Sequence, residues 1–272
     1  MRLKPVLVDK VWGLDSLPPP FASVPGKRIG EIWFDPQDAL PDLLVKYIFT
    51  SEKLSVQCHP DDAQANAAGH GTNGKDECWL VIDADEGAQL GIGFKKDIDK
   101  DTMRRAALDG TIEELLAWHE VAPGDFFYLP ANTVHAIGAG LSIVEIQQNS
   151  NVTYRLYDYG RPRELHLDEG LRVASGKRFD PALRRRVPTE VSMTLVEGPH
   201  FRLDQLAGSP HEDLHPAYRD AVLVIPRAGT VEVSGEDVVP GECAMAGALD
   251  EVGIPDGAVC LVAAPHRIED EM

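Results

Sequence analysis

Short apolar or alternating runs recur along the whole chain and are separated by turn residues. Glycine and proline, 24 and 20 in number, are spread throughout instead of being pooled in one linker. Strands at this density with turn signals between them predict an all-β sandwich or barrel. The clearest runs are 44–49, 54–59, 77–82, 126–130, 141–147, 221–225 and 258–263.

Helical patterns gather in the middle of the chain. A short helix is expected after His-Pro-Asp-Asp, over 63–68, and a longer one over 99–109, ending at Gly110. Thr111 followed by Glu114 has the spacing of a capping box, so another helix is expected to start there with Ile112, Leu115 and Leu116 facing inward. We therefore predict a small helical insertion near 97–119 within a β domain.

The segment 178–190 is the best candidate for a boundary, since it holds two prolines and a basic run but no sustained apolar period. Segments 121–130 and 238–247 align at a constant offset of 117, each with a Pro-Gly turn, an acidic residue and a short strand. Two related β units are the simplest explanation. We predict a first unit at 1–180 and a second β unit at 181–272.

Charge narrows the classes of partner. Lys and Arg number 26 against 44 Asp and Glu among 272 residues, which gives a net charge of −18. So acidic a surface repels nucleic acid and anionic membranes, and the run 184–186 is interpreted as a solvated connection, not a nucleic-acid patch. No apolar stretch is long enough to span a membrane, and the start lacks the pattern of a signal peptide. Four cysteines without a CxxC pair predict reduced thiols and a cytoplasmic protein.

Polar residues two apart in two of the strands are the first candidates for chemistry. Residues two apart on a strand share a face, so Ser55, Gln57 and His59 are expected to project together. The same rule places Lys75 beside Glu77. In both strands the alternate positions, which include a cysteine, are expected to face the packed interior.

A third pattern leads to His135. Gly124, Pro130, Asn132 and His135 have a spacing that resembles the second motif of the cupin superfamily, in which a hairpin turn points a histidine into a jelly-roll barrel. Asn132 stands where glycine is usual, and asparagine tolerates the left-handed backbone best among other residues. Two imidazoles and two oxygen donors suit a divalent ion such as Zn²⁺ with positions open to substrate. Those four candidates are Gln57, His59, Glu77 and His135. All lie in the unit 1–180, which is therefore expected to be catalytic and metal-binding. At the offset of 117 His135 falls on Val252, so the cupin-like unit 181–272 is expected to be metal-free.

Further motifs in the same order give a closer match. The chain resembles the type I mannose-6-phosphate isomerases in their short bacterial form, from about residue 5 to 175. The motifs are Trp-Gly at 12–13, Gly-Glu-x-Trp at 30–33, Gln-x-His-Pro-Asp-Asp at 57–62, Lys-x-Glu-x-Trp at 75–79, Val-x-Pro-Gly-Asp at 121–125, His-Ala-Ile-Gly-Ala-Gly at 135–140 and the run 145–161. The chain departs from the family pattern at Leu14 and Ile32.

The resemblance implies a zinc-dependent interconversion of mannose 6-phosphate and fructose 6-phosphate through an enediol, with one Zn²⁺ per chain. Gln57, His59, Glu77 and His135 match the zinc ligands, and Lys75 and Arg155 match cationic residues of the active site. Ser55, on the face of Gln57, is expected to join Lys75 and Arg155 in binding the phosphosugar.

Several alternatives stay open at this point. Strand alternation groups Arg155 with Thr153 and Tyr157, but an ordinary strand arginine paired to Asp158 or Glu145 is the plainer interpretation. The proton-transferring base and the oligomeric state are unassigned. The protein could also be an isomerase of another phosphosugar, or a sugar-phosphate-binding cupin without turnover.

Overall fold

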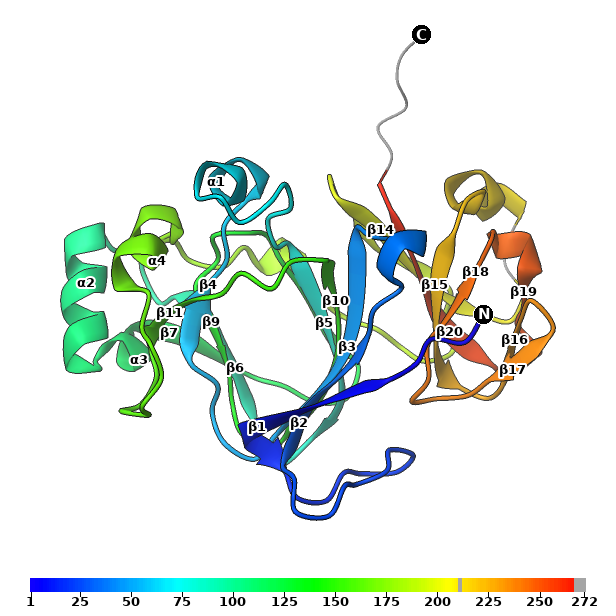
Figure 1. Ribbon diagram of the computed structural model, residues 1–272, viewed down its shortest axis with the longest axis horizontal. Helices are drawn as coiled ribbons and strands as arrows, with labels where there is room; N and C mark the ends of the chain where they lie inside the picture. Colours follow the sequence, from blue (N-terminus) through cyan, green and yellow to red (C-terminus); the bar gives the residue numbers. More distant parts are fainter. Residues whose placement is uncertain (210–211, 267–272) are drawn as a thin grey trace, which may run out of the picture.

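The computed structural model describes residues 1–209 and 212–266, and its first unit is built from two facing sheets (Figure 1). One sheet has seven strands in the order β1-β2-β3-β10-β5-β8-β12, and the other has five in the order β11-β4-β9-β6-β7. The predicted all-β cupin barrel is thereby confirmed. The first sheet comprises β1 (Val6–Leu14), β2 (Ile29–Phe34), β3 (Leu43–Thr50), β10 (Leu141–Gln148), β5 (Glu77–Ala84), β8 (Asp125–Leu129) and β12 (Arg184–Arg186); the second comprises β11 (Tyr154–Tyr157), β4 (Val56–Cys58), β9 (His135–Ile137), β6 (Gln89–Phe94) and β7 (Leu116–Glu120).

The two central strands of the large sheet, β3 and β10, are buried along their whole length. One face of β3 looks into the barrel, and the other packs Val45, Tyr47 and Phe49 into a core shared with the second unit. Burial on both faces explains why these strands read as nearly continuous apolar runs. A polar side chain inside such a run, like Lys46 or Glu145, must therefore be held by specific partners.

The helices α2 (Lys100–Asp109), α3 (Ile112–Leu115) and α4 (Leu167–Val173) cover the outside of the smaller sheet at one end of the molecule (Figure 1). Helix α1 (Asp62–Ala67) lies above β4 in the same view. Short 3-10 turns occur at η1 (Gln37–Ala39), η2 (Pro181–Leu183), η3 (Glu212–Tyr218) and η4 (Leu249–Glu251). No helix in the described part of the chain is both long and apolar enough to cross a membrane.

The expected capping box at Thr111 was wrong. Thr111 has helical backbone angles and its side chain makes no capping bond. The Asp109 carboxylate takes the place of a capping side chain. It accepts from the Thr111 amide at 2.9 Å and from the Thr111 hydroxyl at 2.6 Å. The helix is a single turn, and Leu116 already begins β7.

The second unit packs a five-stranded sheet, β13-β14-β20-β15-β18, against a three-stranded one, β17-β16-β19. The predicted repeat appears as the same turn. Gly124 and Gly241 both have φ of +92°, and the acidic residue after each accepts from the amide three positions earlier, at 3.0 and 3.1 Å. The strands are β13 (Met193–Glu197), β14 (Phe201–Ala207), β15 (Val222–Ala228), β16 (Val231–Val233), β17 (Glu236–Val238), β18 (Ala244–Ala246), β19 (Val252–Gly253) and β20 (Val259–Pro265).

The arginine run is not a free connection. Arg184–Arg186 form β12, which pairs with β8 at the edge of the large sheet. Arg184 and Arg186 each lie 3.4 Å from a carboxylate oxygen of Asp125, which accounts for a basic run on an acidic protein. The first unit's sheet thus continues past residue 180, and the exact domain division stays a prediction. Residues 267–272 of the predicted second unit lie outside the described residues.

Candidate active site

Three strands of the first unit bring the predicted metal ligands together. Gln57 on β4 is in register with His135 on β9, His59 follows β4, and Glu77 begins β5. One ligand atom each from His59, Glu77 and His135 lie within 4.8 Å of one another, and all three side chains are buried. The structure therefore gathers, from sequence positions as far apart as 59 and 135, a group that could hold a metal ion.

Backbone carbonyls orient both imidazoles. The Nδ1 atom of His59 lies 2.8 Å from the carbonyl oxygen of Val152, and that of His135 lies 2.9 Å from the carbonyl oxygen of Thr133. A carbonyl only accepts, so Nδ1 carries the proton and the lone pair of Nε2 faces the centre. Burial lowers the pKa of His59 well below its usual value and that of His135 to about 3, which keeps both rings neutral. Neutral imidazoles with inward-facing Nε2 atoms are ready to bind a cation.

Glu77 offers an oxygen with no protein partner. Its Oε2 atom accepts from the Lys75 ammonium at 2.5 Å, whereas Oε1 is buried without a hydrogen bond and lies 3.3 Å from His135 Nε2. Burial raises the pKa of Glu77 to about 7, although the Lys75 charge opposes this. An unsatisfied buried carboxylate oxygen is costly, and a divalent cation between it and the two imidazoles would satisfy it.

Gln57 and Ser55 lie beside this group, on the same face as predicted. The Ser55 hydroxyl donates to Gln57 Oε1 at 3.0 Å, and Gln57 Nε2 lies 3.3 Å from His135 Nε2. Rotating the amide by a half turn would exchange its two ends and point the oxygen at the centre. As predicted, Val56, Cys58 and Cys78 face away from the site and are fully buried.

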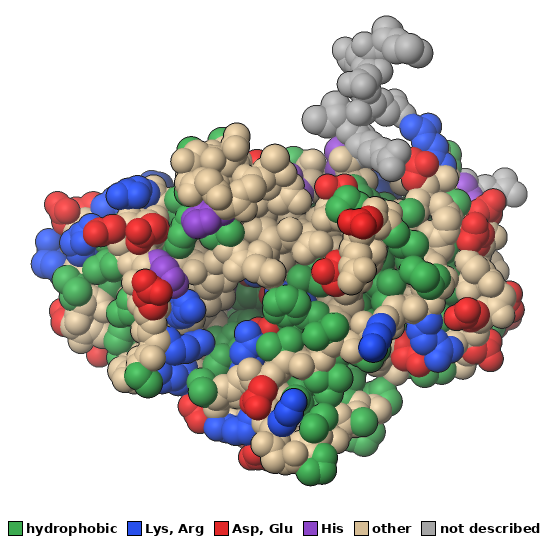
Figure 2. Space-filling view, in the orientation of Figure 1, with side chains coloured by type: hydrophobic (Ala, Val, Ile, Leu, Met, Phe, Trp, Pro, Cys, Tyr) green, Lys and Arg blue, Asp and Glu red, His purple; other side chains and the backbone are tan. Residues whose placement is uncertain are grey.

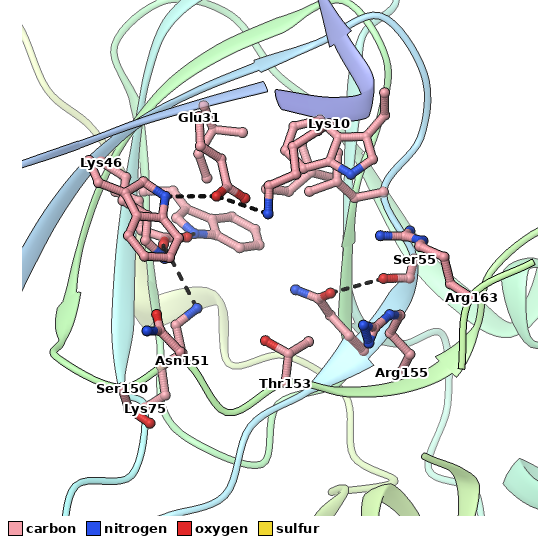
Figure 3. Close-up of a pocket in the computed structure, with 18 of the residues that line it drawn as sticks. Lys10, Glu31, Lys46, Ser55, Lys75, Ser150, Asn151, Thr153, Arg155 and Arg163 are labelled. Atoms are coloured by element: carbon pink, nitrogen blue, oxygen red, sulfur yellow. Dashed lines mark hydrogen bonds and ion pairs between the residues drawn. The ribbon is translucent and has the colours of Figure 1, made fainter. Parts of the chain in front are cut away.

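A cavity of about 390 Å³ lies next to this group, and Gln57 and Lys75 are the members of the site that line it (Figure 3). Five Lys or Arg residues and only two acids line it. Figure 2 shows a hollow on this face with basic side chains around it, on a chain whose net charge is −18. A positive site on so acidic a protein favours a small anionic ligand.

Most of these cations are already paired. Lys10 lies 3.2 Å from Glu31, Lys46 3.1 Å from Glu145, and Arg163 binds both oxygens of Asp158 at 2.6 and 2.7 Å. The Arg155 guanidinium makes no hydrogen bond or ion pair within the described ranges 1–209 and 212–266. It is therefore the cation that a ligand can use without breaking a protein contact.

The alternation expected around Arg155 is only partly present. Thr153 and Arg155 line the cavity, but a bulge after Arg155 shifts the register of β11, and Tyr157 packs toward Gly110 at the end of α2. The plainer interpretation of Arg155 does not hold either, since Asp158 binds Arg161 and Arg163 and Glu145 binds Lys46 and Trp79.

Several lining residues were not predicted from the sequence. Lys10, Glu31 and Lys46 lie on one side of the cavity and face Ser55 and Arg155 across its open centre (Figure 3). A lysine at the centre of the apolar run 44–49 is the one signal that could have found Lys46, because a charge in a buried strand needs a partner. Lys46 has Glu145 and Gln147 as partners.

Asn132 keeps the turn before His135 and adds contacts that glycine could not make. Its φ is +71°, as predicted for the glycine position of the motif. Its side-chain amide donates to the His59 carbonyl at 3.1 Å and to Gln64 of α1 at 2.7 Å. The turn that carries His135 is thereby fastened to the segment that carries His59.

The pKa shifts predict how the stability of the metal-free protein depends on pH. Between pH 4.5 and 6.5 the unfolded chain protonates His59 and His135 while the folded protein keeps both neutral, and Glu77 behaves in the opposite sense. His119 shifts in the same direction as these two histidines, so the unfolded chain holds at least one proton more than the folded protein. The free energy of unfolding should therefore rise with pH by at least about 1.4 kcal/mol per unit. Urea unfolding of chelator-treated protein at pH 5.0 and 6.5 measures this.

The matched variant is His135→Asn, which removes one of the two protons. Its free energy of unfolding should rise with pH less steeply than the parent's, by about 1.4 kcal/mol per unit less. An equally steep slope in the variant would contradict a buried neutral His135.

Comparisons with known proteins agree with this geometry. No family model matches the chain. Mannose-6-phosphate isomerase ManA of Bacillus subtilis is 32% identical over 87% of this chain and 88% of its own length. The crystal structure of the mannose 6-phosphate isomerase from Bacillus subtilis has a TM-score of 0.76 at 23% identity, covering 96% of this chain and 98% of that one.

A mannose 6-phosphate isomerase bound with zinc and yttrium has the same fold, with a TM-score of 0.69 at 16% identity over 98% of this chain and 99% of that one. The likeness in fold extends over both units, and the likeness in sequence to the Bacillus subtilis ManA protein covers most of both chains. The chain belongs to the mannose-6-phosphate isomerase family.

Proposed function

We propose that the protein is a zinc-dependent isomerase that interconverts mannose 6-phosphate and fructose 6-phosphate. The observation that carries the proposal is the buried group of His59, Glu77 and His135, with one carboxylate oxygen unsatisfied, beside a cavity lined by cations. Family membership names the substrate, and the cavity's charge fits a phosphorylated sugar.

One zinc ion per chain would be held by His59, Glu77 and His135, with Gln57 as the fourth ligand after its amide rotates. The donor set of two imidazoles and oxygen atoms, with no thiolate, is typical of a zinc site that keeps positions open for substrate. When bound, the ion supplies a Lewis acid that polarises a substrate oxygen. The four ligands and the ion together would carry a net charge of +1.

Lys75 is suited to stabilise negative charge on the reacting oxygens. Burial acts to lower its pKa, but Glu145 and Glu77 outweigh burial and raise it, so the ammonium form persists. Its Nζ atom lies 2.5 Å from Glu77 and 3.3 Å from His59 Nε2, at the inner end of the cavity. A protonated Lys75 cannot accept the proton from carbon; it donates to the oxygen on which charge develops.

Arg155 is the candidate for the phosphate. A guanidinium can bind two phosphate oxygens at once, and Arg155 is free to do so on the side of the cavity that Ser55 shares. The isomerisation then moves a proton from C2 to C1 through an enediol while the phosphate anchors the far end of the sugar. Ser55, whose hydroxyl holds Gln57, is expected to contact the sugar as well.

The direct test is turnover. Purified protein is incubated with mannose 6-phosphate, and fructose 6-phosphate is followed before chelation, after chelation, and after zinc is returned. Loss with the chelator and recovery with zinc are expected. Zinc binding without turnover would instead favour another phosphosugar or a binding protein, and absence of zinc binding would refute the metal site.

A further inference from the structure

Asp76 lies between the two active-site residues Lys75 and Glu77 but serves neither as a ligand nor in the cavity. It is 5% exposed, and both of its carboxylate oxygens are occupied. Oδ2 accepts from the Tyr128 hydroxyl, and Oδ1 accepts from the Ala131 amide at 2.8 Å. Within the described residues it forms no ion pair, so a buried negative charge is held here by neutral donors alone.

These bonds connect the strand of Glu77 to the turn of His135. Tyr128 lies on β8, directly opposite Cys78 of β5. Ala131 opens the turn that leads to His135 on β9. One carboxylate therefore sets the spacing between two of the three residues of the metal group.

The C-terminal unit contacts Tyr128 through the turn between β13 and β14, residues 198–200, and through the first residue of β14. The Tyr128 ring packs against Phe201 with ring centroids 6.1 Å apart, and its hydroxyl faces Gly198 so closely that a Cβ there would come within 3.0 Å of it. The hydroxyl that binds Asp76 is thus confined by the second unit.

The same turn makes a second contact toward the site. His200 Nδ1 lies 3.6 Å from Asp62 Oδ2, and Asp62 Oδ1 accepts from the Gly74 amide at 2.6 Å and from Gln148 at 2.9 Å. Gln148 in turn accepts from the Asp76 amide at 2.8 Å. Two chains of contacts from one turn therefore converge on residues 74–77.

We propose that Asp76 is a positioning residue through which the 198–200 turn of the C-terminal unit fixes Glu77 and His135 in the geometry that zinc requires. The proposal rests on the metal site of the proposed function. It gives the second unit, which contributes no residue to the metal group, a role in the chemistry of the first. Groups behind metal ligands change affinity by about 10–100-fold, and because Asp76 acts through the backbone we expect the lower end of that range.

The first experiment measures zinc dissociation constants by competition with a chromogenic chelator. Asp76→Asn and Tyr128→Phe should each weaken zinc binding about tenfold. In both variants activity should fall at limiting zinc and return to within about threefold of the parent at saturating zinc, since the ligands themselves remain.

The matched control is Tyr218→Phe. Tyr218 donates to the buried Asp204 in the core of the second unit. This is another buried tyrosine–aspartate hydrogen bond, remote from the metal group, although Asp204 also binds Arg202. The substitution should lower the free energy of unfolding in urea without changing the zinc dissociation constant. If Asp76→Asn also lowers stability while its zinc affinity stays within twofold, Asp76 is only structural and the proposal is wrong.

The second experiment tests transmission from the C-terminal unit. Gly198→Ala places a methyl group against the Tyr128 hydroxyl and should weaken zinc binding severalfold. In the Tyr128→Phe background, where the hydroxyl is absent, the same substitution should have little further effect. Equal losses in both backgrounds would overturn the proposed route. A parent protein that binds zinc and turns over while these variants match it refutes only this inference; a parent that binds no zinc refutes the proposed function itself.

Discussion

The His135→Ala variant will lose zinc binding and isomerase activity together while keeping the fold. His135 supplies one of three protein atoms in the buried metal group and is in register with Gln57, so its removal takes away one ligand and the neighbour that orients another. Loss of a ligand should cost more than the 10–100-fold that is typical of groups behind ligands, so we expect activity to fall by more than about 100-fold. Zinc content after dialysis and turnover of mannose 6-phosphate are the two measurements.

His119→Ala is the matched control for this variant. His119 on β7 is a half-buried histidine next to two aromatic rings, Phe127 and Phe179, and its Nε2 has no hydrogen-bond partner among the described residues. It lies outside the cavity lining, so zinc content and turnover should stay near the parent's. If His135→Ala binds zinc as tightly as the control does, the metal group has been wrongly assigned.

The metal group could be predicted because strand geometry is local. Residues two apart share a face, so the positions of Gln57, His59 and Glu77 relative to their neighbours follow from the alternation alone. The turn before His135 is equally local, since only a few residue types accept the backbone of Asn132. What the sequence could not give is the distance between these strands, which depends on pairing across more than 70 residues.

Two expectations, the capping box at Thr111 and the alternation around Arg155, failed because another local interaction prevailed over the one that the spacing predicts. Thr111 and Glu114 have the spacing of a capping box, but Asp109 binds the Thr111 amide first. The bulge after Arg155 breaks the alternation that would have placed Tyr157 in the cavity. In both cases the spacing was present and a neighbouring residue or a register shift decided the outcome.

The wall of the cavity opposite Arg155 was missed for a different reason. Lys10, Glu31 and Lys46 come from three strands of the large sheet, and no local pattern in the sequence places them on one wall. These residues meet only when the strands pair. Strand β2 lies between β1 and β3 and brings Glu31 within 3.2 Å of Lys10. Only the assembled sheet shows that Lys10 pairs with Glu31 and Lys46 with Glu145. Among the described residues Arg155 has no such partner.

Arg155→Ala should raise KM for mannose 6-phosphate by about 10–100-fold with a much smaller change in kcat. Hydrogen bonds to charged groups contribute about 1.5–3 kcal/mol, which corresponds to that range, and a phosphate far from the reacting carbons is bound equally in the ground and transition states. Inorganic phosphate, used as a competitive inhibitor, should lose affinity in parallel. Arg155→Lys should recover part of the binding, because an ammonium keeps the charge but not the two-point contact.

Arg161→Ala is the control, because Arg161 follows the strand that carries Arg155 and binds Glu52 at 2.9 Å and Asp158 at 3.2 Å without lining the cavity. It should leave KM and phosphate inhibition unchanged. Whether the Arg155→Ala substitution changes KM or kcat distinguishes a role in phosphate binding from a role at the reacting carbons. If kcat falls and KM does not, Arg155 acts at the reacting carbons. The phosphate would then have to be held by Lys10 or Arg163, each of which must first give up a carboxylate. Added salt would in that case weaken phosphate binding less than it weakens binding to an unpaired guanidinium.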